Sequence, residues 1–154
     1  MDANHINAVI ESFMNVMPQL GLTDVKREDV SLKGRYIKSP GVVIILGIVG
    51  DIKGNIIYGI GTEDAKKIAS CMMMGMPVEE FNELAQSAIS ELTNMLTATV
   101  ATNFSKQGIN VNISTPTLVY GEFTANASTE KVICVGISAN GMRIDANISL
   151  EKSL

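Results

Sequence analysis

Hydrophobic residues recur along the chain with two spacings, one typical of helices and one of strands. A helical spacing runs over residues 6–20, over residues 63–74 behind a capping Thr62, and over residues 79–106. The last segment holds neither Gly nor Pro, which predicts a single helix roughly 40 Å long. The face of this helix expected to pack on a sheet consists of Phe81, Leu84, Ala88, Leu92, Met95 and Thr99.

Strand-like patterns fill the intervals between these helices. A weak strand is expected at residues 30–37, after a polar stretch, and the apolar run 42–49 predicts a central strand buried on both faces. Its return partner is expected at residues 55–60. Asn140 and Gly141 predict a type I′ hairpin turn. The remaining strands are expected at residues 110–114, 118–123, 131–138 and 142–150, the last with strict alternation.

The same order of elements occurs twice along the chain. Each half begins with a helix, passes through a Ser-Pro or Thr-Pro pair at Pro40 or Pro116, and ends in an apolar hairpin. This weak duplication predicts an α/β (α+β) fold with one mostly antiparallel sheet and helices packed on it. No linker or low-complexity segment divides the halves, so we expect residues 1–154 to form a single domain.

Composition excludes several classes of protein. The net charge of −4 gives no electrostatic attraction for nucleic acid or for an anionic membrane surface. The chain has one His and two Cys, so it lacks most of the side chains from which a Ser-His-Asp triad or a zinc site of His and Cys is built. The N-terminus lacks a signal-peptide pattern and the longest apolar run is eight residues, so we expect a cytoplasmic protein.

A few side chains have two interpretations. His5 is expected to be solvated on the first helix, and Cys71 and Cys134 to be small buried hydrophobes. The four methionines at positions 72, 73, 74 and 76 are compatible with an adaptable partner surface, although filling of core and loop is the more frequent role of such a cluster. The glycines near residues 47–61 lack a complete nucleotide-binding motif and are better explained by turns.

A stripe on the long predicted helix carries candidate chemistry. Ser87, Glu91, Asn94, Ala98 and Ala101 follow one another at steps of four, three, four and three, which places them on one side of the helix. Small neighbours let another surface approach the carboxylate and the carboxamide closely. Asn is also roughly 0.5 kcal/mol less favourable than Ala inside a helix. Spacing alone nevertheless favours a solvated helix face, because a Glu-X-X-Asn pair is common there.

The residues around this stripe resemble a known family. Residues 87–98, with Glu91 and Asn94, are similar to the signature helix of the CheC/CheX/FliY phosphatases of bacterial chemotaxis. Residues 113–122 around Pro116 resemble the Pro-containing strand of that family, and residues 47–54 and 65–69 resemble its first half.

Within this family the resemblance is greatest to the CheX type, because one active helix is intact. The corresponding part of the first helix reads Glu11-Ser-Phe-Met14, where a second site would carry an Asn. The family helix also often carries Gly four residues after the Asn, whereas this chain has Ala98.

The resemblance implies a phosphatase acting on a phosphorylated response regulator of the CheY type. Asn94 would orient the attacking water at the phosphoaspartate, and Glu91 would pair with the active-site Lys of the regulator. Ser87, Ala98 and Pro116 would contact this partner. The protein would need no metal or cofactor of its own, because the regulator would bring the Mg²⁺. An amide that positions water is compatible with the demands of phosphoryl transfer.

The family also implies a homodimer, and an exposed sheet edge would be a suitable place for it. One alternative to the phosphatase is a non-catalytic module, either an adaptor that binds a response regulator or a relative of the flagellar switch proteins. A third class, an enzyme of small-molecule metabolism, has no supporting site residues.

Overall fold

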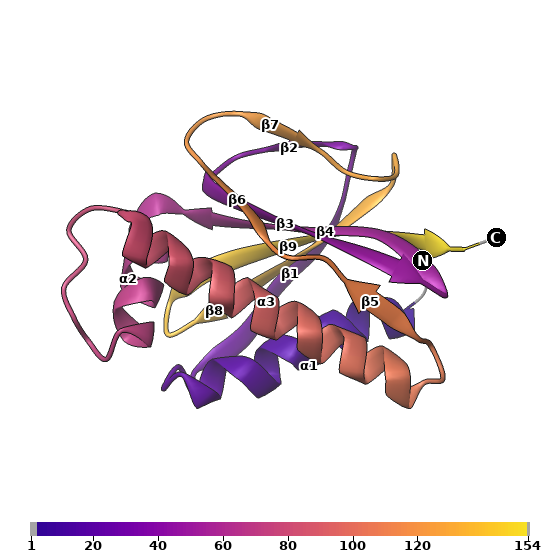
Figure 1. Cartoon of the computed structure of the whole chain (residues 1–154), viewed down its shortest axis with the longest axis horizontal. Helices are drawn as coiled ribbons and strands as arrows, with labels where there is room; N and C mark the ends of the chain where they lie inside the picture. Colours follow the sequence, from indigo (N-terminus) through magenta and orange to yellow (C-terminus); the bar gives the residue numbers. More distant parts are fainter. Residues whose placement is uncertain (1–2, 154) are drawn as a thin grey trace.

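The computed structural model describes residues 3–153, which form three helices and nine strands (Figure 1). The helices are α1 (Ala3–Gln19), α2 (Thr62–Met72) and α3 (Glu83–Lys106). The strands are β1 (Val25–Lys33), β2 (Tyr36–Lys38), β3 (Gly41–Gly50), β4 (Ile52–Gly61), β5 (Val111–Ile113), β6 (Thr117–Tyr120), β7 (Thr124–Asn126), β8 (Val132–Ala139) and β9 (Met142–Lys152).

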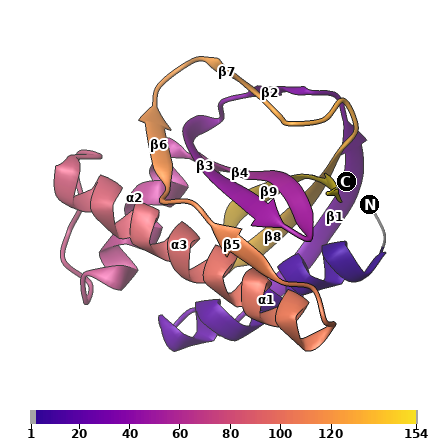
Figure 2. The same ribbon diagram turned by 45° about the vertical axis from the view of Figure 1, so that its right-hand side comes forward.

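One antiparallel sheet organises the molecule. Its strands follow the order β1-β8-β9-β4-β3-β5, and β6 also pairs with β3. Helices α1 and α3 cover one face, whereas the small sheet of β2 and β7 lies over the other (Figures 1 and 2). The predicted fold class, a mostly antiparallel sheet with helices packed on it, is confirmed.

The alternation of apolar residues places the core as the sequence predicts. Val42, Ile44, Leu46 and Ile48 of β3 face the helices. Val43 of the same strand belongs to a second buried cluster under β2 and β7, so β3 is buried on both faces. The inward residues of β9 also follow the predicted alternation, and all are in the main core: Met142, Ile144, Ala146, Ile148 and Leu150.

The first strand region differs from its prediction. The polar stretch before residue 30 is part of β1, whereas Tyr36 and Ile37 belong to β2 in the second sheet. β1 is an edge strand whose residues after Val25 are exposed, so its pairing with β8 leaves no hydrophobic pattern in the sequence. Backbone hydrogen bonds, rather than burial of side chains, define this strand.

The helix starts also differ from their predictions. Thr62 is the first residue of α2 and not its cap, because Gly61 occupies the N-cap position. The long helix begins at Glu83 instead of residue 79, since the Asn82 side chain caps it by accepting a hydrogen bond of 3.0 Å from the amide of Ala85. Its 24 residues span about 36 Å at 1.5 Å per residue.

The buried face of α3 is rotated from the predicted one. Of the predicted face Phe81, which precedes the helix, and Leu92 are buried, whereas Leu84 is 58% exposed and Ala88, Met95 and Thr99 are half-buried. Threonines take core positions, which a search for apolar spacing does not detect. The buried residues are Ala85, Ile89, Leu92, Thr93, Leu96, Thr97, Val100 and Phe104.

Two predictions for single residues are wrong. His5 is buried, and its ring meets Phe104 edge-on at a centroid distance of 5.6 Å, because α1 turns this side toward α3. Cys71 is exposed near the end of α2, whereas Cys134 is buried as predicted. None of the helices formed by residues 3–153 combines the length and the hydropathy needed to cross a membrane.

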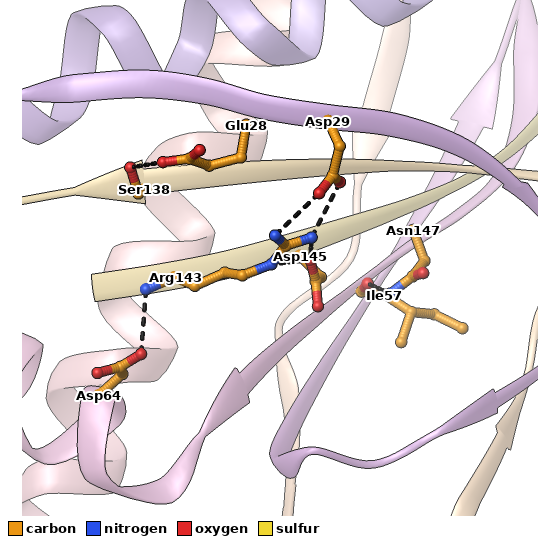
Figure 3. Close-up of polar contacts among 8 residues, drawn as sticks. All are labelled: Glu28, Asp29, Ile57, Asp64, Ser138, Arg143, Asp145 and Asn147. Atoms are coloured by element: carbon orange, nitrogen blue, oxygen red, sulfur yellow. Dashed lines mark hydrogen bonds and ion pairs between the residues drawn. The ribbon is translucent and has the colours of Figure 1, made fainter. Parts of the chain in front are cut away.

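A charged network joins β1 and β9 (Figure 3). It lies on the face of the sheet opposite α1 and α3, because Ile144 and Ala146, which alternate with Arg143 and Asp145 on β9, belong to the main core. The Arg143 guanidinium on β9 donates two hydrogen bonds of 2.9 Å to Asp29 on β1 and one of 3.0 Å to Asp145. The hydrogen bonds from Arg143 hold the pKa of Asp29 below its usual value. Gly136 lies beneath this contact, and a β-carbon there would collide with both partners. The network therefore connects β1 to β9 across β8.

Candidate functional site

A bulge in the sheet edge forms one wall of the candidate site. Ile113 of β5 lies opposite Ile48 of β3, whereas Thr117 of β6 lies opposite Ile45. Four steps along one strand therefore match three along the other, which is the signature of one extra residue. The residues between β5 and β6 leave the regular ladder, and Pro116, which has no amide hydrogen, sits among them.

The bulge is fixed by paired hydrogen bonds. The Ser114 amide donates to the Gly47 carbonyl at 2.9 Å, and the Gly47 amide donates to Ser114 Oγ at 2.8 Å. Ser114 Oγ donates in turn to the Thr115 carbonyl at 3.0 Å. These contacts hold the segment between β5 and β6, which runs beside α3 (Figure 2) and contains Thr115 and Pro116.

An open groove of about 550 Å³ separates this bulge from α3. The helix contributes Glu83, Gln86, Ser87, Ser90, Glu91 and Asn94, and the opposite wall is Thr115, Pro116 and Leu118. The two walls come from segments that are distant in the chain but both packed against β3.

The structure brings four of the five predicted site residues to this groove. Ser87, Glu91 and Asn94 line its helical wall, and Pro116 lines the other. Ala98 is exposed on the same stripe but lies one turn beyond the groove lining. Glu91 is exposed and Asn94 is half-buried, so the carboxamide sits deeper than the carboxylate.

The polar head groups of the site are free to meet a partner. Within residues 3–153, the side chains of Glu91 and Asn94 make no hydrogen bond or ion pair. The groove lining contains the carboxylates of Glu83 and Glu91 and no Lys or Arg. The site is thus suited to a cationic group such as a Lys ammonium, which forms strong charge-assisted hydrogen bonds with a carboxylate.

A buried contact behind the groove, which the sequence analysis missed, positions α3. Tyr58 of β4 and Thr97 of α3 share a hydrogen bond of 2.9 Å, and Thr97 also donates to the Thr93 carbonyl at 2.8 Å. Burial raises the pKa of the Tyr58 hydroxyl. The available signal was a Tyr inside an apolar strand, because a buried phenol usually has a hydrogen-bond partner.

The protein's own side chains do not gather into a metal centre in the part of the chain that the structure describes. No group of three or more His, Cys, Asp or Glu is placed there to bind an ion. The groove therefore offers a carboxylate and a carboxamide on a rigid helix, facing a Pro-containing wall. Such a site can dock and orient a group that a partner supplies.

These features define an α/β protein that presents a Glu-X-X-Asn pair from one long helix at an edge groove. Residues 42–138 match the family described as "Chemotaxis phosphatase CheX". The chain is also 37% identical over 123 residues to "CheY-P phosphatase CheX" of Thermotoga maritima, covering 79% of this chain and 78% of that protein. The chain belongs to the chemotaxis phosphatase CheX family.

Solved structures show the same fold. The chemotaxis protein CheX of Vibrio vulnificus matches with a TM-score of 0.84 and 23% identity, over 97% of this chain and 100% of that chain. A structure described as the CheX-CheY-BeF3-Mg+2 complex from Borrelia burgdorferi matches with a TM-score of 0.68 and 18% identity, over 97% of this chain and 96% of that chain.

Proposed function

We propose that this protein hydrolyses the phosphoaspartate of a CheY-type response regulator, with Asn94 and Glu91 as its working side chains. The observation that carries the proposal is the groove in which an unpaired carboxamide and an unpaired carboxylate, one helical turn apart, face Pro116. The relative from Thermotoga maritima, a CheY-P phosphatase by name, supports the substrate class.

The chemistry needs little from the protein beyond positioning. A water oxygen attacks phosphorus in line, the bond from phosphorus to the aspartate oxygen breaks, and inorganic phosphate leaves a free carboxylate on the regulator. The Asn94 carboxamide, half-buried in the groove wall, would hold that water by hydrogen bonds. Phosphoryl transfer depends mainly on orientation and charge stabilisation, which an amide can provide in this way.

Glu91 has a docking role in this proposal. Its exposed carboxylate lies one turn before Asn94, where it would pair with the active-site Lys of the regulator. The pairing would fix the regulator so that its phosphoryl group lies beside Asn94. Ser87 and Pro116 would contact the regulator from opposite walls of the groove. Ala98 would contact it one turn further along α3. The Mg²⁺ would arrive with the regulator, as part of the substrate.

The decisive experiment measures release of inorganic phosphate from a phosphorylated CheY-type regulator. We expect Asn94→Ala to lower kcat by about 100-fold or more, the loss typical of a removed transition-state hydrogen bond. Gln107→Ala, which removes an exposed carboxamide beyond the far end of α3, is the matched control and should keep the full rate. A full rate of phosphate release by Asn94→Ala would refute the mechanism. If the unaltered protein binds the phosphorylated regulator without accelerating its hydrolysis, the protein is an adaptor instead.

Two further properties belong to the proposal. The protein would act in the cytoplasm, where response regulators are phosphorylated, and as a homodimer formed by a single-domain chain. The long exposed edge of β1 is a suitable place for pairing, because its outer backbone groups face away from β8. A sedimentation mass equal to one chain would rule out the dimer.

A further inference from the structure

The loop between α2 and α3 displays large apolar side chains at the surface. Met74 is 98% exposed and Met76 56%, and Leu84 in the first turn of α3 is 58% exposed. The more frequent role of such methionines, filling of core and loop, is therefore wrong for Met74 and Met76. Exposed apolar residues that gather in one place are characteristic of an interaction surface. We refer to Met74, Met76 and Leu84 as the methionine patch.

The loop conformation is held by hydrogen bonds to α2. The Gly75 amide donates to the Ser70 carbonyl at 2.8 Å, and Ser70 Oγ donates to the Met76 carbonyl at 2.8 Å. Met74 has a φ of +59°, a left-handed conformation that long side chains rarely adopt. Met74 directly follows the C-cap of α2, where a left-handed residue lets the Gly75 amide reach the Ser70 carbonyl and end the helix. This backbone leaves the Met74 side chain projecting from the surface, almost fully exposed.

Two members of the methionine patch, Met76 and Leu84, line hollows that are continuous with the proposed active site. Glu83 and Ser87 line both the catalytic groove and the adjoining hollow that contains Leu84. Asn82 and Leu84 line that hollow and also the next one, which contains Met76. One surface therefore runs from Asn94 along the first turns of α3 to the loop at the left end of the molecule in Figure 1.

Carboxylates border this surface. Glu79 and Glu80 line the same hollow as Met76, and Glu83 lies between that hollow and the groove. The neighbouring hollow holds two lysines, of which Lys66 is engaged with Glu63 at 2.9 Å and Lys67 is exposed. An apolar centre with an acidic border fits a partner that presents an apolar side chain flanked by Lys or Arg.

We propose that the methionine patch is a second contact for the response regulator that docks in the groove. The patch would accept an apolar side chain of the regulator, while Glu79 and Glu80 attract flanking basic residues. Methionine side chains are flexible, so they can adapt to the surface of the partner. This inference rests on the proposed function. In it, the methionine patch contributes to the affinity for the regulator and to the choice among regulators, and takes no part in the hydrolysis.

The test compares Met74→Ser/Met76→Ser with the unaltered protein, using the phosphorylated regulator for turnover and the beryllofluoride–Mg²⁺ regulator for binding. We expect KM and the dissociation constant to rise about tenfold while kcat at saturation stays within twofold, the cost of a few lost apolar contacts. Met14→Ser removes a methionine of 41% exposure from α1 and should leave both constants unchanged.

A second variant separates binding from folding. Met74→Gly relieves the left-handed backbone, so its Tm should be equal to or above that of the unaltered protein, while KM still rises. Replacing Glu79 and Glu80 by Gln should flatten the salt dependence of the association rate.

The inference is overturned if the methionine variants keep the KM and the dissociation constant of the unaltered protein. It is also overturned if these variants change the oligomeric mass but bind the regulator as tightly as before. The proposed function fails separately. It is refuted if the unaltered protein releases no phosphate, whereas the binding measurement with the beryllofluoride-loaded regulator still tests the patch. If Asn94→Ala is inactive and the methionine variants behave normally, only the patch is excluded.

Discussion

The hydroxyl of Tyr58 and Oγ1 of Thr97 lie 2.9 Å apart in a buried hydrogen bond that joins the centre of the sheet to α3. The Tyr58 ring also meets Phe13 of α1 at a centroid distance of 6.3 Å. Thr97 follows Asn94 by one helical turn, so this bond fixes the rotation of the helix that carries the candidate site. The position of the carboxamide relative to Pro116 depends on that rotation.

Removing this hydroxyl should lower the free energy of unfolding. In Tyr58→Phe, Thr97 keeps its bond to the Thr93 carbonyl, so only one buried hydrogen bond is lost. We expect the free energy of unfolding to fall by about 1 kcal/mol, and Tm by about 2–4 °C. Denaturant unfolding measures the free energy and thermal unfolding measures Tm. The control is Tyr36→Phe, at a tyrosine that is 72% exposed, which should change neither quantity. Equal losses in the two variants would contradict this role.

The same tyrosine predicts a loss of stability at alkaline pH. Burial raises the pKa of Tyr58 in the folded protein, whereas in the unfolded chain a tyrosine ionises near its ordinary pKa of about 10. The unfolded chain therefore binds fewer protons above that pH. The contribution of Tyr58 is complete below about pH 10 and declines above it by up to about 1.4 kcal/mol per pH unit.

The comparison of Tyr58→Phe with the unaltered protein isolates this effect from other titrating groups. Unfolding free energies at pH 8 and at pH 11 should differ more in the unaltered protein than in the variant. Parallel declines in the two proteins would show that Tyr58 is not the titrating group responsible.

The sequence predicts the fold best where burial follows a simple period. The alternation of β9 and the two-sided apolar run of β3 are confirmed, and so is the turn at Asn140 and Gly141, with φ values of +50° and +83°. β1 could not be predicted in this way, because an edge strand with exposed side chains carries no period. The face of α3 was also missed, since Thr93 and Thr97 satisfy their hydroxyls within the helix and so occupy core positions.

The candidate site was predictable only in part. Helical spacing predicts that Ser87, Glu91 and Asn94 lie on one side of α3, and all three line the groove. This holds even though the buried face of α3 is rotated from the predicted one. That Pro116 faces this stripe depends on a one-residue slip in the pairing of β5 and β6 with β3. A slip of this kind is set by tertiary pairing and leaves no periodic signal in the sequence.

Neutralising Glu91 should weaken docking more than it slows chemistry. Glu91→Gln keeps the size of the side chain but removes its charge, and a charge-assisted hydrogen bond contributes about 1.5–3 kcal/mol. We expect regulator affinity to fall by about 10- to 100-fold, with kcat reduced less than in Asn94→Ala. Calorimetry with the beryllofluoride-loaded regulator measures the affinity. Glu11→Gln, at an exposed position of α1, is the control, and an unchanged affinity for Glu91→Gln would remove its docking role.

A larger side chain at Ala98 should block the partner without disturbing the fold. Ala98 is exposed one turn beyond the groove, so leucine at this position meets solvent in the free protein and is a good helix former. We expect Ala98→Leu to keep the Tm within about 2 °C, because exposed substitutions of this kind have small effects on stability. The same change should raise KM about tenfold, since close approach of the regulator along α3 requires a small residue there.

Ser105→Leu, an exposed change two turns further along α3, provides the comparison for Ala98→Leu. It should leave KM unchanged, because the predicted stripe ends at Ala101. If both leucine variants bind the regulator normally, the bound regulator does not extend past Asn94, and Ala98 has no part in the contact. If Ala98→Leu alone raises KM, the partner surface extends from the groove along α3 at least as far as Ala98.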